Sequence, residues 1–250
     1  MQKHNKKKNA FRVFFIIAVS MLVFCGLLLI FLEPIKAWIR SKYSLKAVDA
    51  FKQGETTIQV PVTDMLSVDG ENGEHEIGAD KLAEDMADFS VDYGSLTLIG
   101  IMEIPCVEIE QPLFSEASTL ALRYGCGKFG GTANIGESGL CSIWGHRDLN
   151  YLSSALGMLQ FLQDHIGDKV YITTPDNMIH EYEITECVYA KDGAVMPWMY
   201  KDTYDEEMLC IVTCGFGEDP ARKGKYYPYN TEFVVVCKPV AVYDYSERSF

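Results

Sequence analysis

The sequence has few basic residues outside its first forty positions, and this shortage excludes one class of partner. Met1–Arg40 holds seven of the 22 Lys and Arg residues but only one of the 35 Asp and Glu residues. The remaining 210 positions carry 15 basic and 34 acidic residues, a net charge of −19. Because so acidic a surface repels phosphate backbones, we expect no nucleic-acid partner.

The chain also lacks the local spacing that usually marks a metal site. Its eight cysteines are irregularly spaced and its five histidines are scattered, with no C-x-x-C pair and no His-rich tract. Zinc sites and ordered calcium-binding loops therefore find no support in the sequence, and no metal or organic cofactor is expected. Seven cysteines lie beyond residue 40, so at least one thiol is left over if the others form disulfides.

Only one long run lacks charge, Val13–Leu32, "VFFIIAVSMLVFCGLLLIFL". A helix needs about 20 such residues to cross the hydrocarbon core, so this run predicts a transmembrane helix. A cleaved signal peptide is the alternative, but its apolar region would be shorter, and "FLEPIKAW" is a poor cleavage site. Basic residues crowd the amino end and place it in the cytoplasm: Lys3, Lys6, Lys7, Lys8 and Arg12. The chain is thus expected to be a single-pass plasma-membrane protein with its main domain outside the cell.

These features divide the chain into segments. Residues 1–12 form the cytoplasmic tail, 13–32 the span, and 33–94 a juxtamembrane segment with an acidic, glycine-containing linker, "SVDGENGEHEIGAD". Residues 95–243 form the main domain, and 244–250 a carboxyl-terminal tail.

The main domain is predicted to be mainly β. It contains short runs rich in Val, Ile, Tyr and Thr: "LTLIGIMEI", "VEIEQPLF", "LCSIWGH", "KVYITT", "HEYEITECVYA", "EMLCIVTC" and "TEFVVVCKPVAVY". Between them, leucines at helical spacing predict one helix over Tyr151–Gln163. Many short strands with one or two helices and no internal repeat favour a closed or nearly closed β-barrel over a propeller.

A cysteine and a histidine stand at similar places in this pattern. Cys214 ends the apolar run "EMLCIVTC", and His146 follows the apolar run "LCSIWG". A nucleophilic cysteine needs a partner that favours its thiolate, and two strand ends can open onto one rim of a barrel. The alternative is that Cys214 is a small buried hydrophobic residue, as free cysteines often are.

The chain resembles the sortase family, the membrane-tethered cysteine transpeptidases of Gram-positive bacteria. "LIGIMEIPCVEIEQPLF" is similar to the first strands of that family, "IWGHRD" to its histidine segment, and "IVTC" to its Thr-x-Thr-Cys-type strand. The resemblance covers about Leu96 to Lys238 and implies a sortase-type β-barrel. It also implies that Cys214 is the nucleophile and His146 its partner, while Thr213 orients the substrate or an arginine. The subclass is left open, with a class B-like sortase among the options.

One position departs from the family pattern. Sortases carry an arginine just before the last apolar strand, whereas here that strand begins "NTEFVVV" with Glu232. Arg222, in "GEDPARKGKYYPYN", is the arginine available between Cys214 and that strand, and could donate two hydrogen bonds to an oxyanion. It is either this donor or a solvated loop residue.

The resemblance implies a function. The enzyme would cleave a C-terminal, LPxTG-like sorting motif of secreted proteins through a thioacyl intermediate and transfer them to an amine of a cell-wall precursor or a pilin. Some sortases use calcium, although no calcium-ligand spacing is visible here. The alternative is a membrane-anchored module that kept the scaffold without catalysis, as Glu232 suggests. Papain-like proteases, with cysteine before histidine, and L,D-transpeptidases, with a Ser-His-Gly-Cys motif, do not match.

Overall fold

A computed structural model describes residues 2–62, 93–147, 155–191, 205–214 and 231–247. The described chain is mainly β with few helices, as the sequence predicts. Its strands are β1 Thr57–Pro61, β2 Tyr93–Ile104, β3 Ile109–Phe114, β4 Cys126–Lys128, β5 Gly139–Gly145, β6 Lys169–Thr173, β7 Met178–Lys191, β8 Glu207–Cys214 and β9 Thr231–Asp244. Its helices are α1 Gln2–Lys52 and α3 Thr119–Tyr124, with 3₁₀ turns η1 Pro105–Val107, η2 Leu159–Asp164 and η3 Tyr245–Glu247.

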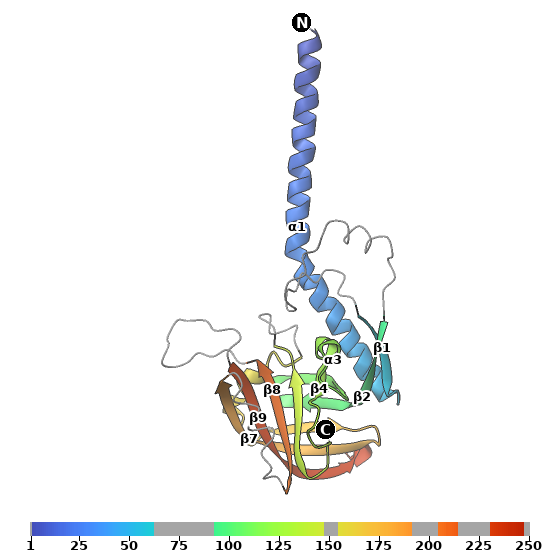
Figure 1. Ribbon diagram of the computed structural model, residues 1–250, viewed down its shortest axis with the longest axis vertical. Helices are drawn as coiled ribbons and strands as arrows, with labels where there is room; N and C mark the ends of the chain where they lie inside the picture. The colour runs from blue at the N-terminus through green and yellow to red at the C-terminus, as the bar shows by residue number, and fades with distance from the viewer. Residues whose placement is uncertain (1, 63–92, 148–154, 192–204, 215–230, 248–250) are drawn as a thin grey trace.

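The strands form one sheet that closes on itself (Figure 1). Hydrogen-bonded neighbours follow the order β1-β2-β3-β4-β5-β8-β9-β7-β6, and β6 also pairs with β2. The sheet is therefore a ring that starts and ends at β2, with β1 added outside it. Most neighbours are antiparallel, but β3–β4 and β5–β8 are parallel.

The ring encloses the main hydrophobic core. Successive strand residues face opposite sides of a sheet, so every second side chain of β5 and β8 enters this core, including Cys141, Ile143, Leu209 and Ile211. The alternate residues of β5 and β8 face outward. With residues of β7 and β9 they form a second apolar cluster: Leu140, Ala190, Cys210, Val212, Val234 and Val236. Trp144 and Phe129 pack on this outer cluster with stacked rings.

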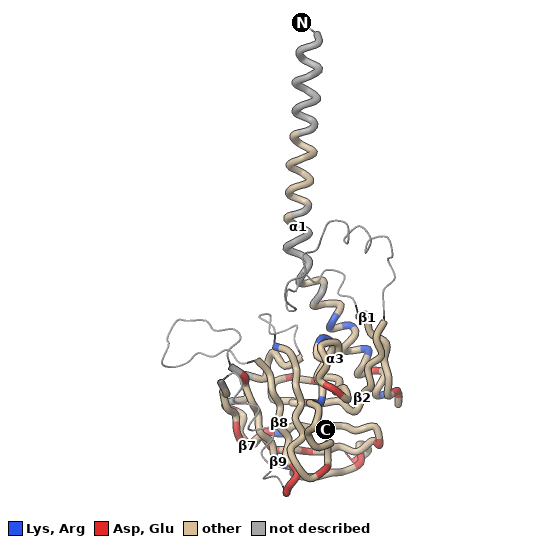
Figure 2. The backbone as a smooth tube through the Cα atoms, in the orientation of Figure 1, with Lys and Arg blue, Asp and Glu red and all other residues tan. Residues whose placement is uncertain are grey.

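A single helix, α1, contains the run predicted to span a membrane, and it projects from the ring (Figure 1). It bends along its length and contains Pro34, a residue that kinks helices. Among the residues that the structure describes, no helix is long and apolar enough to cross a membrane. Figure 2 shows basic residues gathered along the part of α1 beside the sheet, whereas acidic residues are spread over the ring.

The end of α1 belongs to the folded domain. Ala47, Val48 and Phe51 are buried in a third cluster with Ile58 of β1 and Leu98 of β2. No strand is predicted from the sequence at Thr57–Pro61, yet β1 pairs with β2 over its whole length. The segment before residue 95 therefore contributes an edge strand as well as a connection.

The helix predicted over Tyr151–Gln163 takes a different form in its described part. Residues 151–154 lie outside the described residues, residues 155–158 form turns, and Leu159–Asp164 is a 3₁₀ helix. The leucines are nevertheless buried, because Leu156, Leu159 and Leu162 recur every three residues. The spacing of three places Leu159 and Leu162 on one face of the 3₁₀ helix, which has three residues per turn.

Candidate active site

The parallel pairing of β5 with β8 brings His146 and Cys214 to one edge of the ring. Trp144 pairs with Val212, and His146 and Cys214 each lie two residues farther along their chains. Neighbouring strands are about 4.8 Å apart, so residues at matching positions of a parallel pair are neighbours. In Figure 1 both strands point to the end of the ring from which α1 leads away.

The pair is accessible. His146 is exposed and Cys214 is half-buried, unlike most other cysteines of the ring. Cys214 is two residues beyond Val212, so the period of two places it on the outer face of the sheet, next to the outer apolar cluster. A cysteine nucleophile needs a base or a cation near its sulfur, and the strand register brings the imidazole of His146 to the neighbourhood of Cys214.

The side chain of Thr213 forms a hydrogen bond between the ends of β5 and β8. Its side chain is 2% exposed, and its hydroxyl donates a hydrogen bond to the carbonyl oxygen of Gly145 at 2.8 Å. This bond joins the residue before Cys214 to the residue before His146. The structure therefore gives Thr213 a positioning contact, while its predicted contact with substrate stays a prediction.

Gly145 is required by packing just before His146. A Cβ atom there would lie 2.6 Å from Cγ of Leu156 and 3.0 Å from Sγ of Cys126, and both residues are fully buried. The backbone N–H of Leu156 also donates to the carbonyl oxygen of His146 at 3.2 Å. Leu156 therefore contacts the chain at both Gly145 and His146.

Arg147 is a site residue for which the sequence analysis gives no role. It is 7% exposed, and its Nη1 donates a hydrogen bond to the carbonyl oxygen of Cys214 at 3.3 Å. Burial raises the pKa of Tyr189, a residue of β7, and the charge of the Arg147 guanidinium offsets part of this rise. The signal in the sequence is the position of this arginine directly after His146.

Glu232 lies directly across from Cys214. The two residues are paired in the antiparallel register of β8 and β9, and directly opposed residues have Cβ atoms about 4.5–5.5 Å apart. A nearby carboxylate disfavours a thiolate, so the site needs cations to offset it. Arg147 and a protonated His146 are the described groups placed to do so. Arg222, the predicted oxyanion donor, lies outside the described residues.

The sequence that forms the ring also matches a known protein family. Residues 102–240, more than half of the chain, match the family model of the sortase domain. The chain is a member of the sortase family. Among curated proteins, none matches it.

Solved sortase structures resemble this sortase. Sortase A of Listeria monocytogenes is 20% identical, with 59% of this chain and 90% of that chain covered at a TM-score of 0.48. Sortase D5 of Clostridium perfringens is 18% identical, covering 81% and 99% at 0.48. Sortase C1 of Streptococcus suis is 22% identical, covering 60% and 76% at 0.49.

Five other thiols in the described part of this sortase are poor nucleophiles. Burial raises the pKa of Cys141 and of Cys210 to about 12 and that of Cys187 to about 11, and raises the pKa of Cys126 further. Burial also raises the pKa of Cys237 well above its usual value. Because the thiolate is the nucleophile, these cysteines stay unreactive at neutral pH.

Cys106 has its own histidine neighbour, but the surroundings differ from those of Cys214. Ligand atoms of Cys106, His165 and Asp168 all lie within 4.8 Å of one another. Burial raises the pKa of the Cys106 thiol, and the charge of Asp168 and hydrogen bonding to it raise this pKa further. A thiol that keeps its proton beside a carboxylate does not suit the role of nucleophile.

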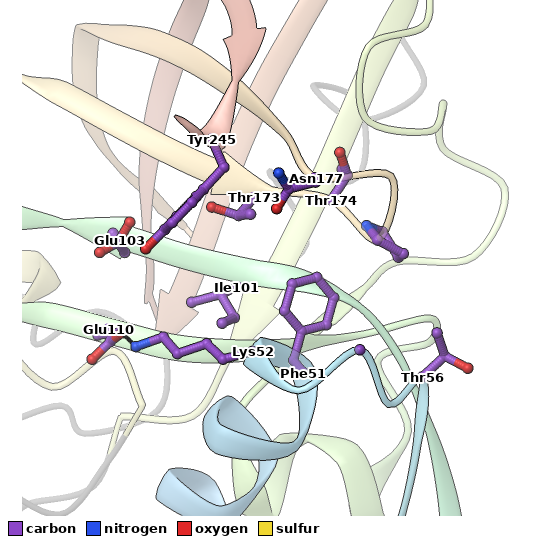
Figure 3. A pocket seen from close by; sticks show the side chains of 12 residues that line it. Phe51, Lys52, Thr56, Ile101, Glu103, Glu110, Thr173, Thr174, Asn177 and Tyr245 are labelled. Atoms are coloured by element: carbon purple, nitrogen blue, oxygen red, sulfur yellow. Dashed lines mark hydrogen bonds and ion pairs between the residues drawn. The ribbon is translucent and has the colours of Figure 1, made fainter. Parts of the chain in front are cut away.

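A cavity of about 320 Å³ lies away from the histidine–cysteine pair (Figure 3). Phe51 and Lys52 of α1 line one side of the cavity, and Ile101 and Glu103 of β2 line another. Tyr245 lines a third side. Lys52 pairs with Glu110 at 2.7 Å in its wall, an exposed ion pair that contributes little to stability. None of the cavity's lining residues belongs to the candidate active site.

Proposed function

We propose that this sortase is a cysteine transpeptidase that cleaves an LPxTG-like sorting motif near the carboxyl end of secreted proteins. The observation that carries the proposal is the parallel β5–β8 pair, which sets accessible His146 and half-buried Cys214 at one edge of the ring. Membership of the sortase family supports the same chemistry.

Acylation begins with the thiolate of Cys214. Its Sγ forms a bond to the carbonyl carbon of the motif's threonine, giving a tetrahedral oxyanion. As the bond from this carbon to the glycine nitrogen breaks, His146 donates a proton to the departing amine. The product is a thioester between Cys214 and the amino-terminal part of the substrate.

Transfer runs through the same groups in reverse. The amine of a cell-wall precursor or a pilin attacks the thioester carbonyl and gives its proton to neutral His146. The carbon–sulfur bond then breaks and the Cys214 thiolate is restored beside imidazolium. No oxidant, nucleotide or other cofactor is consumed in either half.

The oxyanion needs a hydrogen-bond donor, and Arg222 is the predicted one. Its planar guanidinium could donate two bonds to the oxygen, whereas lysine offers charge without that geometry. We expect Arg222→Lys to keep the reactivity of the thiol but to slow acylation by roughly 10²–10³-fold, the usual effect of losing one oxyanion donor. Arg222→Ala acylating as fast as the wild type would assign the donor elsewhere.

The direct test is to trap the thioester. Wild-type protein incubated with sorting-motif peptides should gain the mass of the acyl part at Cys214, and hydroxylamine should remove it. Cys214→Ala should show no adduct, His146→Ala should acylate about 10²–10⁴-fold more slowly, and the control Cys187→Ala should behave as wild type. No thioester with a broad peptide library, from folded protein with an unreactive Cys214, would favour the non-catalytic binding module.

The same proposal includes a membrane tether through residues 13–32, with the catalytic domain outside the cell. Its support is the uncharged run and the exposure of apolar side chains on that part of α1, among them Phe15, Ile16, Leu22 and Phe24. Protease added to intact protoplasts should remove the chain from Lys42 onward. Protection of that domain would contradict the external location.

A further inference from the structure

A cluster of three metal-ligating side chains lies apart from the candidate active site. Cys106 belongs to η1, His165 directly follows η2, and Asp168 directly precedes β6. Their ligand atoms all lie within 4.8 Å of one another. Cys106 and His165 are half-buried and Asp168 is exposed, so an ion can reach them from solvent.

The donor types narrow the choice of ion. A thiolate, an imidazole and a carboxylate are all zinc ligands, whereas calcium and magnesium take oxygen almost alone. Three protein ligands fill three of the four tetrahedral positions of zinc and leave the fourth to water. From this juxtaposition we infer that Cys106, His165 and Asp168 form a binding site for a zinc-like divalent transition-metal ion.

The backbone on both sides of the cluster is fixed before any ion binds. The N–H of Glu108 donates to the carbonyl oxygen of Pro105, which closes the η1 turn. Across the cluster, the N–H of Asp168 donates to the carbonyl oxygen of His165, and the N–H of Ile184 donates to that of Asp168. The donors therefore sit on two rigid turns, so little ordering is needed on binding.

Two side-chain adjustments accompany binding. Nδ1 of His165 and Oδ2 of Asp168 are 2.6 Å apart, whereas two ligands with zinc bonds of about 2.0–2.1 Å lie roughly 3.3 Å apart in a tetrahedron. These side chains are 35% and 49% exposed and can separate. The thiol proton of Cys106 is released to solvent as the sulfur–zinc bond forms.

The site would join two turns that are far apart in the sequence. The turn with His165 and Asp168 follows η2. Leu156, just before η2, donates its backbone N–H to the carbonyl oxygen of His146. A bound ion would therefore brace the segment that supports the catalytic histidine, without touching the reacting atoms.

Zinc binding by the full-length chain in detergent micelles tests the inference. We expect one zinc ion per chain when the metal content is measured by elemental mass spectrometry. The affinity for zinc is measured by competition with a chromophoric chelator. Cys106→Ser should weaken binding by more than about 100-fold, since even outer-shell changes cost about 10–100-fold. His165→Gln and Asp168→Asn, at more exposed positions, should weaken it too, while Cys187→Ser and Asp164→Asn serve as matched controls with wild-type affinity.

Cobalt gives a readout that does not depend on stability. Co²⁺ bound by the wild type should show thiolate-to-metal charge-transfer absorption that Cys106→Ser lacks and Cys214→Ala keeps. The inference is overturned if the wild type binds no zinc or if Cys106→Ser binds it as tightly as wild type. It is also overturned if Cys214→Ala removes the ion, which would place zinc at the catalytic thiol.

Discussion

Nη1 of Arg147 donates a hydrogen bond to the carbonyl oxygen of Cys214 at 3.3 Å, which ties the residue after the proposed base to the backbone of the proposed nucleophile. With the bond from Thr213 to Gly145, it forms two side-chain links between the ends of β5 and β8. Each link can be removed without removing a reacting group.

Arg147 is expected to act as a positioning residue. Arg147→Ala should lower kcat by about 10–100-fold with little change in KM, because a hydrogen bond from a charged group contributes about 1.5–3 kcal/mol. Arg147→Lys, which keeps the charge, should recover part of the loss. Arg123→Ala, which removes an arginine bound to Val62, is the control. Equal kcat in wild type and Arg147→Ala would show that the link is dispensable.

Thr213→Val should loosen the strand ends while keeping the side-chain shape. The carbonyl of Gly145 loses a buried donor, so the free energy of unfolding should fall by about 1–3 kcal/mol in urea titrations. Thr213→Ser retains the hydroxyl and should stay within about 1 kcal/mol of wild type. If the serine variant loses as much stability as the valine variant, the methyl group rather than the hydrogen bond is responsible.

Glu232→Gln should make Cys214 more reactive near neutral pH. Removing a carboxylate across the strand pair lowers the pKa of the thiol, so more thiolate is present at pH 7. The rate of alkylation at Cys214, followed by peptide mass spectrometry against pH, should shift to lower pH. Glu206→Gln, at an exposed position, is the control. A profile that moves to higher pH would mean that Glu232 stabilises the charged pair instead.

Alkylation should also separate Cys214 from the other thiols by pH. At pH 7–9 Cys141, Cys210 and Cys187 remain protonated, since their pKa values are about 12, about 12 and about 11. Cys214 should therefore be labelled first, and the others should gain reactivity only as the pH rises towards 11. Labelling of Cys187 ahead of Cys214 at pH 7 would argue against the activated pair.

Local sequence patterns were sufficient for β2, β3 and β5 to β9 and for the family, because period-two apolar runs and short motifs are local. They could not supply β1 or β4, since Thr57–Pro61 and Cys126–Lys128 are recognisable as strands only through their pairing with β2 and with β3 and β5. Leucine spacing at residues 156–162 fits both helix types, and the local pattern alone does not distinguish the 3₁₀ helix that Leu159–Asp164 adopts. The contacts of Arg147, and the Cys106–His165–Asp168 cluster, join segments too distant for any spacing rule.

The closed order of strands has a consequence for the newly made chain. Thr213 and Gly145 are 68 positions apart, and the β5–β8 ladder cannot form until the intervening β6 and β7 have been made. Such non-local pairing must overcome loop-closure entropy and is slow to form. Before that closure the thiol of Cys214 has no imidazole beside it, so the reactivity proposed for this thiol depends on completed folding of the ring.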